Sequence, residues 1–126
     1  LKGNCTVATT TATNAYRGNG EVSRILGNRD SFATDERAML NGQTVYRVST
    51  DEWVVAAMNV AIIQPFTGKV TPTTTTPRIL NQFGEDVSYP LTIQEYAVDK
   101  QLNIFGKTYY EISLNGFINS SQVKMG

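Results

Sequence analysis

The residues of this chain best suited to hold an anion are its arginines, which are concentrated in the first half. Five arginines precede position 64, whereas only Arg78 follows it. A guanidinium group pairs with phosphate oxygens two at a time, so this concentration predicts a local phosphate-binding face. The alternative is a scattered set of hydrated surface charges. The five candidates are Arg17, Arg24, Arg29, Arg37 and Arg47.

Aromatic side chains could supply a second kind of chemistry, because a flat ring stacks against the C–H face of a sugar. Trp53 is the only tryptophan, and it is the best candidate for an exposed platform. Tyr16 and Tyr109 are expected in a turn or off the core face, so both are candidates as well. Lys107 completes the set of predicted polymer-binding residues. The alternative for Trp53 is a place in the core, since aromatic residues bury the largest apolar area.

Catalytic and metal-binding chemistry finds little support. The chain has no histidine, which removes the commonest general base and the commonest metal ligand. Its single cysteine, Cys5, cannot form an internal disulfide or a Cys-based zinc site. The acidic pairs at 35–36, 51–52 and 85–86 are expected in turns, because neighbours on a strand point to opposite faces. We therefore expect a non-enzymatic protein that uses neither a metal nor a cofactor.

Length and charge narrow the function further. The chain has 126 residues, and its eleven Lys and Arg balance eleven Asp and Glu. This size suits one domain or two small lobes, and zero net charge removes the long-range attraction on which nucleic-acid binding depends. No apolar run approaches the roughly 20 residues of a membrane-spanning helix. The first eleven residues lack the apolar core of a signal peptide, so we expect a fragment of a longer protein.

The sequence repeats itself at a constant offset. Sliding it by 64 positions aligns Gly42–Ser49 with Gly106–Ser113, and it places Trp53 on Phe117. Pro65 and the proline-flanked threonine stretch that follows mark a boundary between the copies. The predicted units are residues 1–64 and 65–126.

Within each unit the apolar residues alternate with a period of two, which predicts strands joined by tight turns. Asn41-Gly42 and Phe105-Gly106 are hairpin signals. Tyr46 and Tyr110 are expected on the core face of the strands that follow these turns. About five short strands in some sixty residues predict a mainly β fold, made of two tandem small β-barrel or SH3-like lobes.

Short helical elements are expected at a few places. Residues 29–40 also fit a helix, because Asp30 or Ser31 could cap it, although the corresponding residues 93–104 alternate better as a strand. One turn of 3₁₀ helix is expected at 56–59 and again at 120–122.

The stretch at 42–56, Gly-x-Thr-x-Tyr-x-Val-Ser-Thr-Asp-Glu-Trp-Val-x-Ala, resembles the surface-layer protein (SLAP) domain of lactobacilli. Repeats of that family close on a "GKxYYxVSTNEWVxAxDV" stretch, and residues 106–123 are a weaker version of it. Residues 14–20 are similar to the opening "AxVYDKNGKR" of the family, and residues 81–85 occupy that place in the second copy. The resemblance covers nearly the whole chain, as two tandem copies.

The resemblance implies a secreted protein of the Gram-positive cell wall or surface layer. Paired repeats of this family attach surface-layer proteins and enzymes to wall polymers such as teichoic and lipoteichoic acids, and they are often strongly basic. This chain departs from that pattern, because its net charge is zero. We expect a non-catalytic wall-binding module that holds its polymer in a groove between the lobes, lined by exposed aromatic and arginine side chains. The alternatives are a self-assembling lattice domain and an accessory module of a wall hydrolase.

Overall fold

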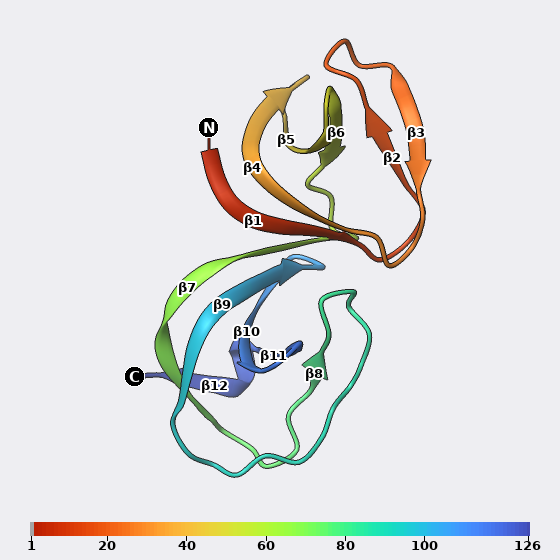
Figure 1. Cartoon of the computed structure of the whole chain (residues 1–126). Helices are drawn as coiled ribbons and strands as arrows, with labels where there is room; N and C mark the ends of the chain where they lie inside the picture. Colours follow the sequence, from red (N-terminus) through yellow and green to blue (C-terminus); the bar gives the residue numbers. More distant parts are fainter. Residues whose placement is uncertain (1) are drawn as a thin grey trace.

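The fold is mainly β in the computed structural model of the chain. The structure describes residues 2–126, and it describes their side chains except at positions 2–4 and 35. The described part contains no α-helix. Figure 1 shows β1 to β6 in one half of the molecule and β7 to β12 in the other. The elements of the first half are β1 (Lys2–Thr9), β2 (Thr13–Tyr16), β3 (Val22–Leu26), β4 (Ser31–Leu40), β5 (Gln43–Ser49) and β6 (Glu52–Val55). Those of the second half are β7 (Val60–Pro72), β8 (Ile79–Leu80), β9 (Tyr96–Ile104), β10 (Lys107–Ser113), β11 (Gly116–Asn119), the 3₁₀ helix η1 (Ser120–Gln122) and β12 (Val123–Met125).

The strands form one hydrogen-bonded path that does not close into a barrel. Its order is β3-β2-β6-β5-β4-β1-β7-β9-β10-β11-β8, with β12 added to β7. The long strand β7 connects the two halves, because Val60–Ile63 pairs with β1 while Ile62–Pro65 and Gly68–Val70 pair with β9. The predicted boundary at 64/65 therefore lies inside a continuous strand, beside the register shift between Pro65 and Gly68.

The two predicted hairpins are confirmed. Leu40 lies opposite Gln43, and Ile104 lies opposite Lys107. The turn residues have positive φ in both, 52° and 77° in the first and 54° and 71° in the second. Two successive residues with a left-handed backbone conformation give a turn whose twist matches the right-handed twist of the flanking strands. Glycine adopts this conformation without steric strain, which explains why a glycine stands second in each turn.

The pairing register around these hairpins is the same in both halves at an offset of 64. The next hairpin of each half also carries a register shift at corresponding positions, just before its turn. The β4–β5–β6 and β9–β10–β11 segments therefore pair in the same way. Three cross-strand pairs of the first half are Arg37–Tyr46, Tyr46–Val54 and Tyr16–Trp53. Their counterparts in the second half, in the same order, are Gln101–Tyr110, Tyr110–Ile118 and Leu80–Phe117.

Three local expectations are settled by the backbone. The strand interpretation of residues 29–40 is correct, since Ser31–Leu40 forms β4 between β1 and β5. The acidic pair 35–36 consequently lies within that strand, and its assignment to a turn is wrong. The 3₁₀ turn is confirmed at Ser120–Gln122, where the Asn119 side chain accepts the Ser121 N–H at 2.8 Å, whereas residues 56–59 form an ordinary turn.

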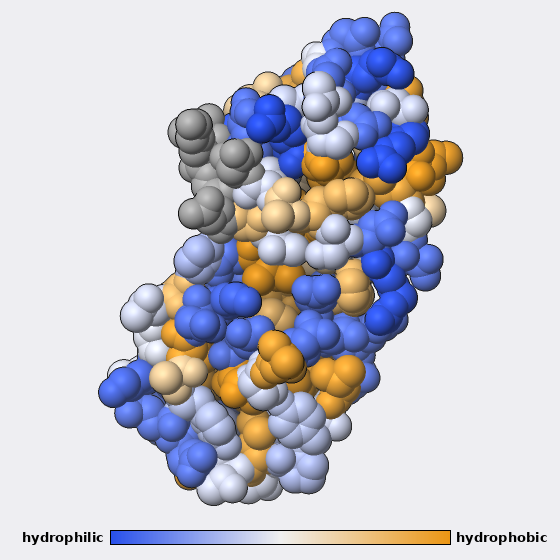
Figure 2. Space-filling view, in the orientation of Figure 1, coloured by the Kyte–Doolittle hydropathy of each residue, from blue (hydrophilic) through white to orange (hydrophobic). Residues whose placement is uncertain are grey.

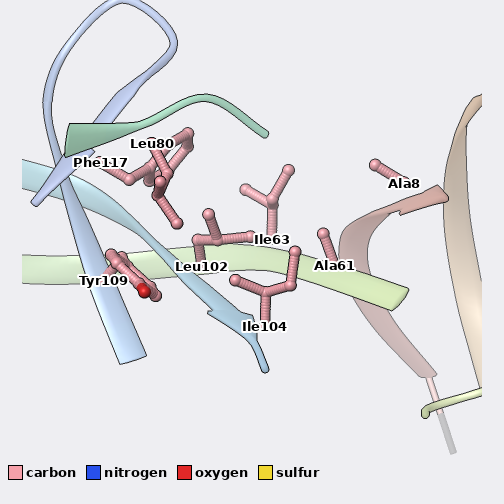
Figure 3. Close-up of a cluster of buried hydrophobic side chains, with 8 residues drawn as sticks. All are labelled: Ala8, Ala61, Ile63, Leu80, Leu102, Ile104, Tyr109 and Phe117. Atoms are coloured by element: carbon pink, nitrogen blue, oxygen red, sulfur yellow. The ribbon is translucent and has the colours of Figure 1, made fainter. Parts of the chain in front are cut away.

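Two hydrophobic clusters share the β1–β7 pair as a common wall. Successive residues of a strand point to opposite faces, so each strand of the pair contributes to both clusters. The first-half cluster comprises Val7, Ala15, Leu26, Tyr46, Val54, Val60 and Ile62. The second-half cluster, drawn in Figure 3, comprises Ala8, Ala61, Ile63, Leu80, Leu102, Ile104, Tyr109 and Phe117.

The shared wall makes the two halves bury different faces of corresponding strands. Tyr109 and Phe117 are 4% and 2% exposed, because both belong to the second-half cluster, where Figure 3 shows Phe117 beside Leu80 and Tyr109 beside Leu102. Placing Tyr109 off the core face is therefore wrong. Tyr110 is only half-buried, with its ring centroid 5.0 Å from that of Phe66.

The other face of the second-half sheet is buried as well. Ile79 and Ile118, which neighbour Leu80 and Phe117 in their strands, are fully buried. In the first half, Trp53 and Tyr16 stand where the second half has Phe117 and Leu80, yet both remain half-buried. That face of the first half is therefore less completely covered at these two positions than its counterpart in the second half.

Candidate functional site

Three of the predicted polymer-binding residues lie side by side on the outer face of the first half. Tyr16 is the cross-strand partner of Trp53, and Trp53 is the partner of Arg47. Directly opposed residues of antiparallel strands point to the same face, with their Cβ atoms about 4.5–5.5 Å apart. All three side chains are half-buried, so each keeps an accessible part. We call Tyr16, Trp53 and Arg47 the aromatic row.

The row has an apolar end and a charged end. Val22, which is 52% exposed, lies opposite Tyr16 on β3. At the other end Nη1 of Arg47 lies 3.1 Å from Oε2 of Glu36 on β4. The resulting strip offers flat apolar surface followed by groups that donate and accept hydrogen bonds.

Glu52, which precedes Trp53 on β6, links β3 to the end of β5. Its carboxylate accepts hydrogen bonds from the hydroxyls of Ser49 and Ser23, the latter at 2.7 Å, and its Oε2 lies 3.1 Å from Nε of Arg24. The hydrogen bonds from Ser49 and Ser23, together with Arg24, lower the pKa of Glu52 to about 2 from its usual 4.5. Glu52 is thus charged at neutral pH and neutralises Arg24.

The other predicted arginines do not join the row. Arg29 pairs with Glu85 of the second half, and its guanidinium lies 4.7 Å from the centre of the Phe83 ring. Arg17 is exposed in the turn between β2 and β3, and Arg37 is half-buried on β4. Because Arg24, Arg29 and Arg47 each contact a carboxylate, most of the arginine charge predicted for phosphate is balanced within the protein.

The two remaining candidates lie in the second half, away from the row. Lys107 is exposed beside the turn between β9 and β10, where it borders a small hollow of about 280 Å³. Tyr109 belongs to the buried cluster described above and presents no accessible ring.

A larger cavity of about 880 Å³ lies where the two halves meet. Figure 2 shows apolar side chains at this junction, with hydrophilic residues on either side. The described residues that line it include none of the nine predicted site residues, and Phe117 is the one aromatic residue among them. Its lining is Cys5, Thr6, Ala33, Thr34, Ile63, Gln64, Pro65, Gln82, Asp99, Lys100, Glu111, Leu114, Asn115 and Phe117.

The charged residues of this cavity interact with one another. Burial raises the pKa of the Glu111 carboxyl, Lys100 opposes that rise, and a hydrogen bond with Asp99 adds to it. Burial also raises the pKa of the Cys5 thiol, while the charge of Arg37 opposes the rise. Sequence reasoning missed the cavity because its lining comes from separate segments of both halves and carries no motif.

Comparison with known proteins adds no functional assignment. The chain matches no family model, and no curated protein gives a match. Within residues 2–126 no helix is long and apolar enough to cross a membrane. No three His, Cys, Asp or Glu side chains of the described part are grouped as a metal ion would require.

Proposed function

We propose that this chain is a non-catalytic module that attaches a bacterial surface-layer or secreted protein to the cell wall, with the aromatic row as its contact to a wall glycopolymer. The observation that carries the proposal is the placement of Tyr16 and Trp53 as accessible neighbours on one face, beside Arg47. Sugar rings present apolar C–H faces that stack on aromatic rings, and their hydroxyls pair with adjacent polar groups. The row supplies both.

The resemblance to the SLAP domain supports the same function. Its most specific stretch, residues 42–56, contains Trp53 and Arg47 of the row. The equal register of the two halves supports two SH3-like repeats, residues 1–64 and 65–126, within the mainly β fold. We assign the module to the outside of a Gram-positive cell, at the wall or surface layer, as the resemblance implies.

The charges favour the sugar portion of the polymer over its phosphates as the main contact. The net charge is zero, and three of the five first-half arginines already contact carboxylates. Phosphate-driven attachment would weaken steeply with salt, whereas stacking would not. We therefore expect wall binding that survives high salt and the removal of teichoic acids.

The test is retention of the purified chain by isolated Gram-positive cell walls, before and after acid extraction of teichoic acids. We expect retention by both preparations, and a loss of about 0.5–1.5 kcal/mol, or roughly 2- to 12-fold in affinity, for Trp53→Ala. Phe105→Ala is the matched control, because Phe105 is an exposed aromatic residue of the second half. Absence of retention by intact walls would contradict the proposal, as would equal losses for the two variants.

A second candidate function is self-assembly into a surface lattice, which the zero net charge favours because copies of the chain do not repel one another at long range. Concentration-dependent growth in light scattering would favour this function, and a monomer at all concentrations would exclude it.

A further inference from the structure

The cavity between the halves is separate from the aromatic row and has its own chemistry. It is walled by β1 and β4 of the first half and by β7 and β9 to β11 of the second. Its volume of about 880 Å³ falls in the usual range of small-ligand sites, about 300–1,000 Å³. We propose that it is a second binding site, which takes a neutral sugar residue.

The lining matches the two-sided character of a sugar. The exposed Ala33, Pro65 and Leu114 provide the apolar surface of the cavity, and the buried Ile63 and Phe117 lie beneath it. Gln64, Gln82 and Asn115 bring side-chain amides, each of which donates and accepts hydrogen bonds as vicinal hydroxyls require. A cavity with an apolar wall and a few converging polar groups is the usual architecture of a small-molecule site.

The charges select against an anionic ligand. Asp99 and Glu111 carry two carboxyl groups, and Lys100 is the only basic residue among the described lining residues. A phosphate would meet a site with a surplus of negative charge, which disfavours it. A neutral sugar meets no such penalty, and the carboxylates can accept hydrogen bonds from its hydroxyl groups.

The loop at the mouth of the cavity is held in place and presents an apolar rim. The Asn115 side-chain oxygen accepts the Gln82 N–H at 3.2 Å, which ties the β10–β11 turn to the segment after β8. Leu114 beside it is 97% exposed. A sugar in the cavity would cover Leu114 and bridge the two halves.

Cys5 makes the site measurable, because it is the only cysteine and it lines the cavity. The experiment measures the rate at which iodoacetamide, a neutral reagent, alkylates Cys5 in the presence of methyl glycosides of glucose, galactose and N-acetylglucosamine. Glycerol 3-phosphate serves as the anionic comparison. If alkylation needs the empty cavity, the rate falls by the factor 1 + [L]/Kd, where [L] is the glycoside concentration and Kd its dissociation constant. The rate is therefore about elevenfold lower when the glycoside is present at ten times its Kd.

Two tryptophan substitutions at corresponding positions supply the control. Ala33 is exposed and lines the cavity, so Ala33→Trp fills it, whereas the exposed Ala97 of β9 is not part of the lining. We expect at least one neutral glycoside to slow alkylation in the wild type and in Ala97→Trp, with no such effect in Ala33→Trp. Amide NMR signals of Gln64, Gln82 and Asn115 in the wild type should shift with the same glycoside, which keeps the test independent of the folding of either variant.

Three results would overturn the proposal: no glycoside slows alkylation or shifts these amides, Ala33→Trp is protected as well as the wild type, or glycerol 3-phosphate protects better than the glycosides. Alkylation of Cys5 reports on the cavity, whereas substitution of Trp53 reports on the aromatic row. A failure of this proposal can therefore be told apart from a failure of the proposed function.

Discussion

Replacing the aromatic residue at corresponding positions of the two halves should cost very different amounts of stability. Phe117 and Trp53 occupy the same place in the pairing register, opposite Glu111 and Arg47 respectively. Phe117 is 2% exposed within the second-half cluster, whereas Trp53 is half-buried. We predict that Phe117→Ala lowers the free energy of unfolding by about 3–5 kcal/mol, as expected for a buried phenylalanine. Trp53→Ala should lower it by about 2 kcal/mol, because only part of the ring area leaves water on folding.

The assay is urea unfolding followed by far-ultraviolet circular dichroism, which does not depend on the tryptophan that one variant removes. The difference between the two variants is the quantity of interest, since it cancels errors common to both. A loss for Trp53→Ala equal to or larger than that for Phe117→Ala would refute the reasoning. It would mean that the outer face of the first half is covered as fully as its counterpart.

The remaining predictions concern single contacts. Glu52 has a folded pKa of about 2 against a usual 4.5, so its contribution to stability is present above about pH 4.5 and is lost as the pH falls toward 2. Glu52→Gln should therefore be less stable than the wild type at neutral pH and equally stable near pH 2. In acid titrations followed by circular dichroism, a stability difference between the two proteins that stays the same at every pH would contradict this. A Cβ on Gly116 would lie 2.5 Å from Oγ of Ser113 and 2.8 Å from the hydroxyl of Tyr89. Gly116→Ala should consequently cost about 1–3 kcal/mol in urea unfolding, and a cost near zero would show that the loop yields freely. Arg29→Ala should remove both the contact with the Phe83 ring, about 0.5–1 kcal/mol, and the ion pair with Glu85, and the loss should shrink in high salt because salt screens the ion pair. A salt-independent loss in urea unfolding would argue against a contribution from the ion pair.

The local backbone was largely predictable from the sequence. Asn41-Gly42 and Phe105-Gly106 predicted two-residue turns because glycine and asparagine tolerate positive φ, and the structure has both turns, with Phe105 at a positive φ that bulky residues rarely adopt. The alternation in Thr44–Ser49 predicted a strand, and β5 covers it. For residues 29–40 the pattern was ambiguous, and pairing with β1 and β5 decided in favour of the strand.

The faces that the strands bury were not predictable from the sequence. A period of two separates two faces but does not say which one another element covers. Tyr109 was expected to be accessible, and it is buried in a cluster that includes residues of β1, β7, β8, β9 and β11. These strands come together through long-range pairing, such as that of β1 with β7 across some fifty positions, which no local pattern records.

Part of the site was predictable and part was not. Tyr16, Trp53 and Arg47 were singled out by residue type, and the register brings them into one row. The cavity could not be anticipated, because Cys5, Gln64 and Asn115 are ordinary residues until the fold brings their segments together.

Titration of the chain with soluble wall polysaccharide, followed by Trp53 fluorescence, tests the central proposal most directly. Trp53 is the only tryptophan, so every change in emission reports on the aromatic row. We predict a saturable change that persists at high salt and disappears in Arg47→Ala combined with Tyr16→Ala. Constant Trp53 emission while the chain binds the polymer would contradict the account, and so would binding that high salt abolishes.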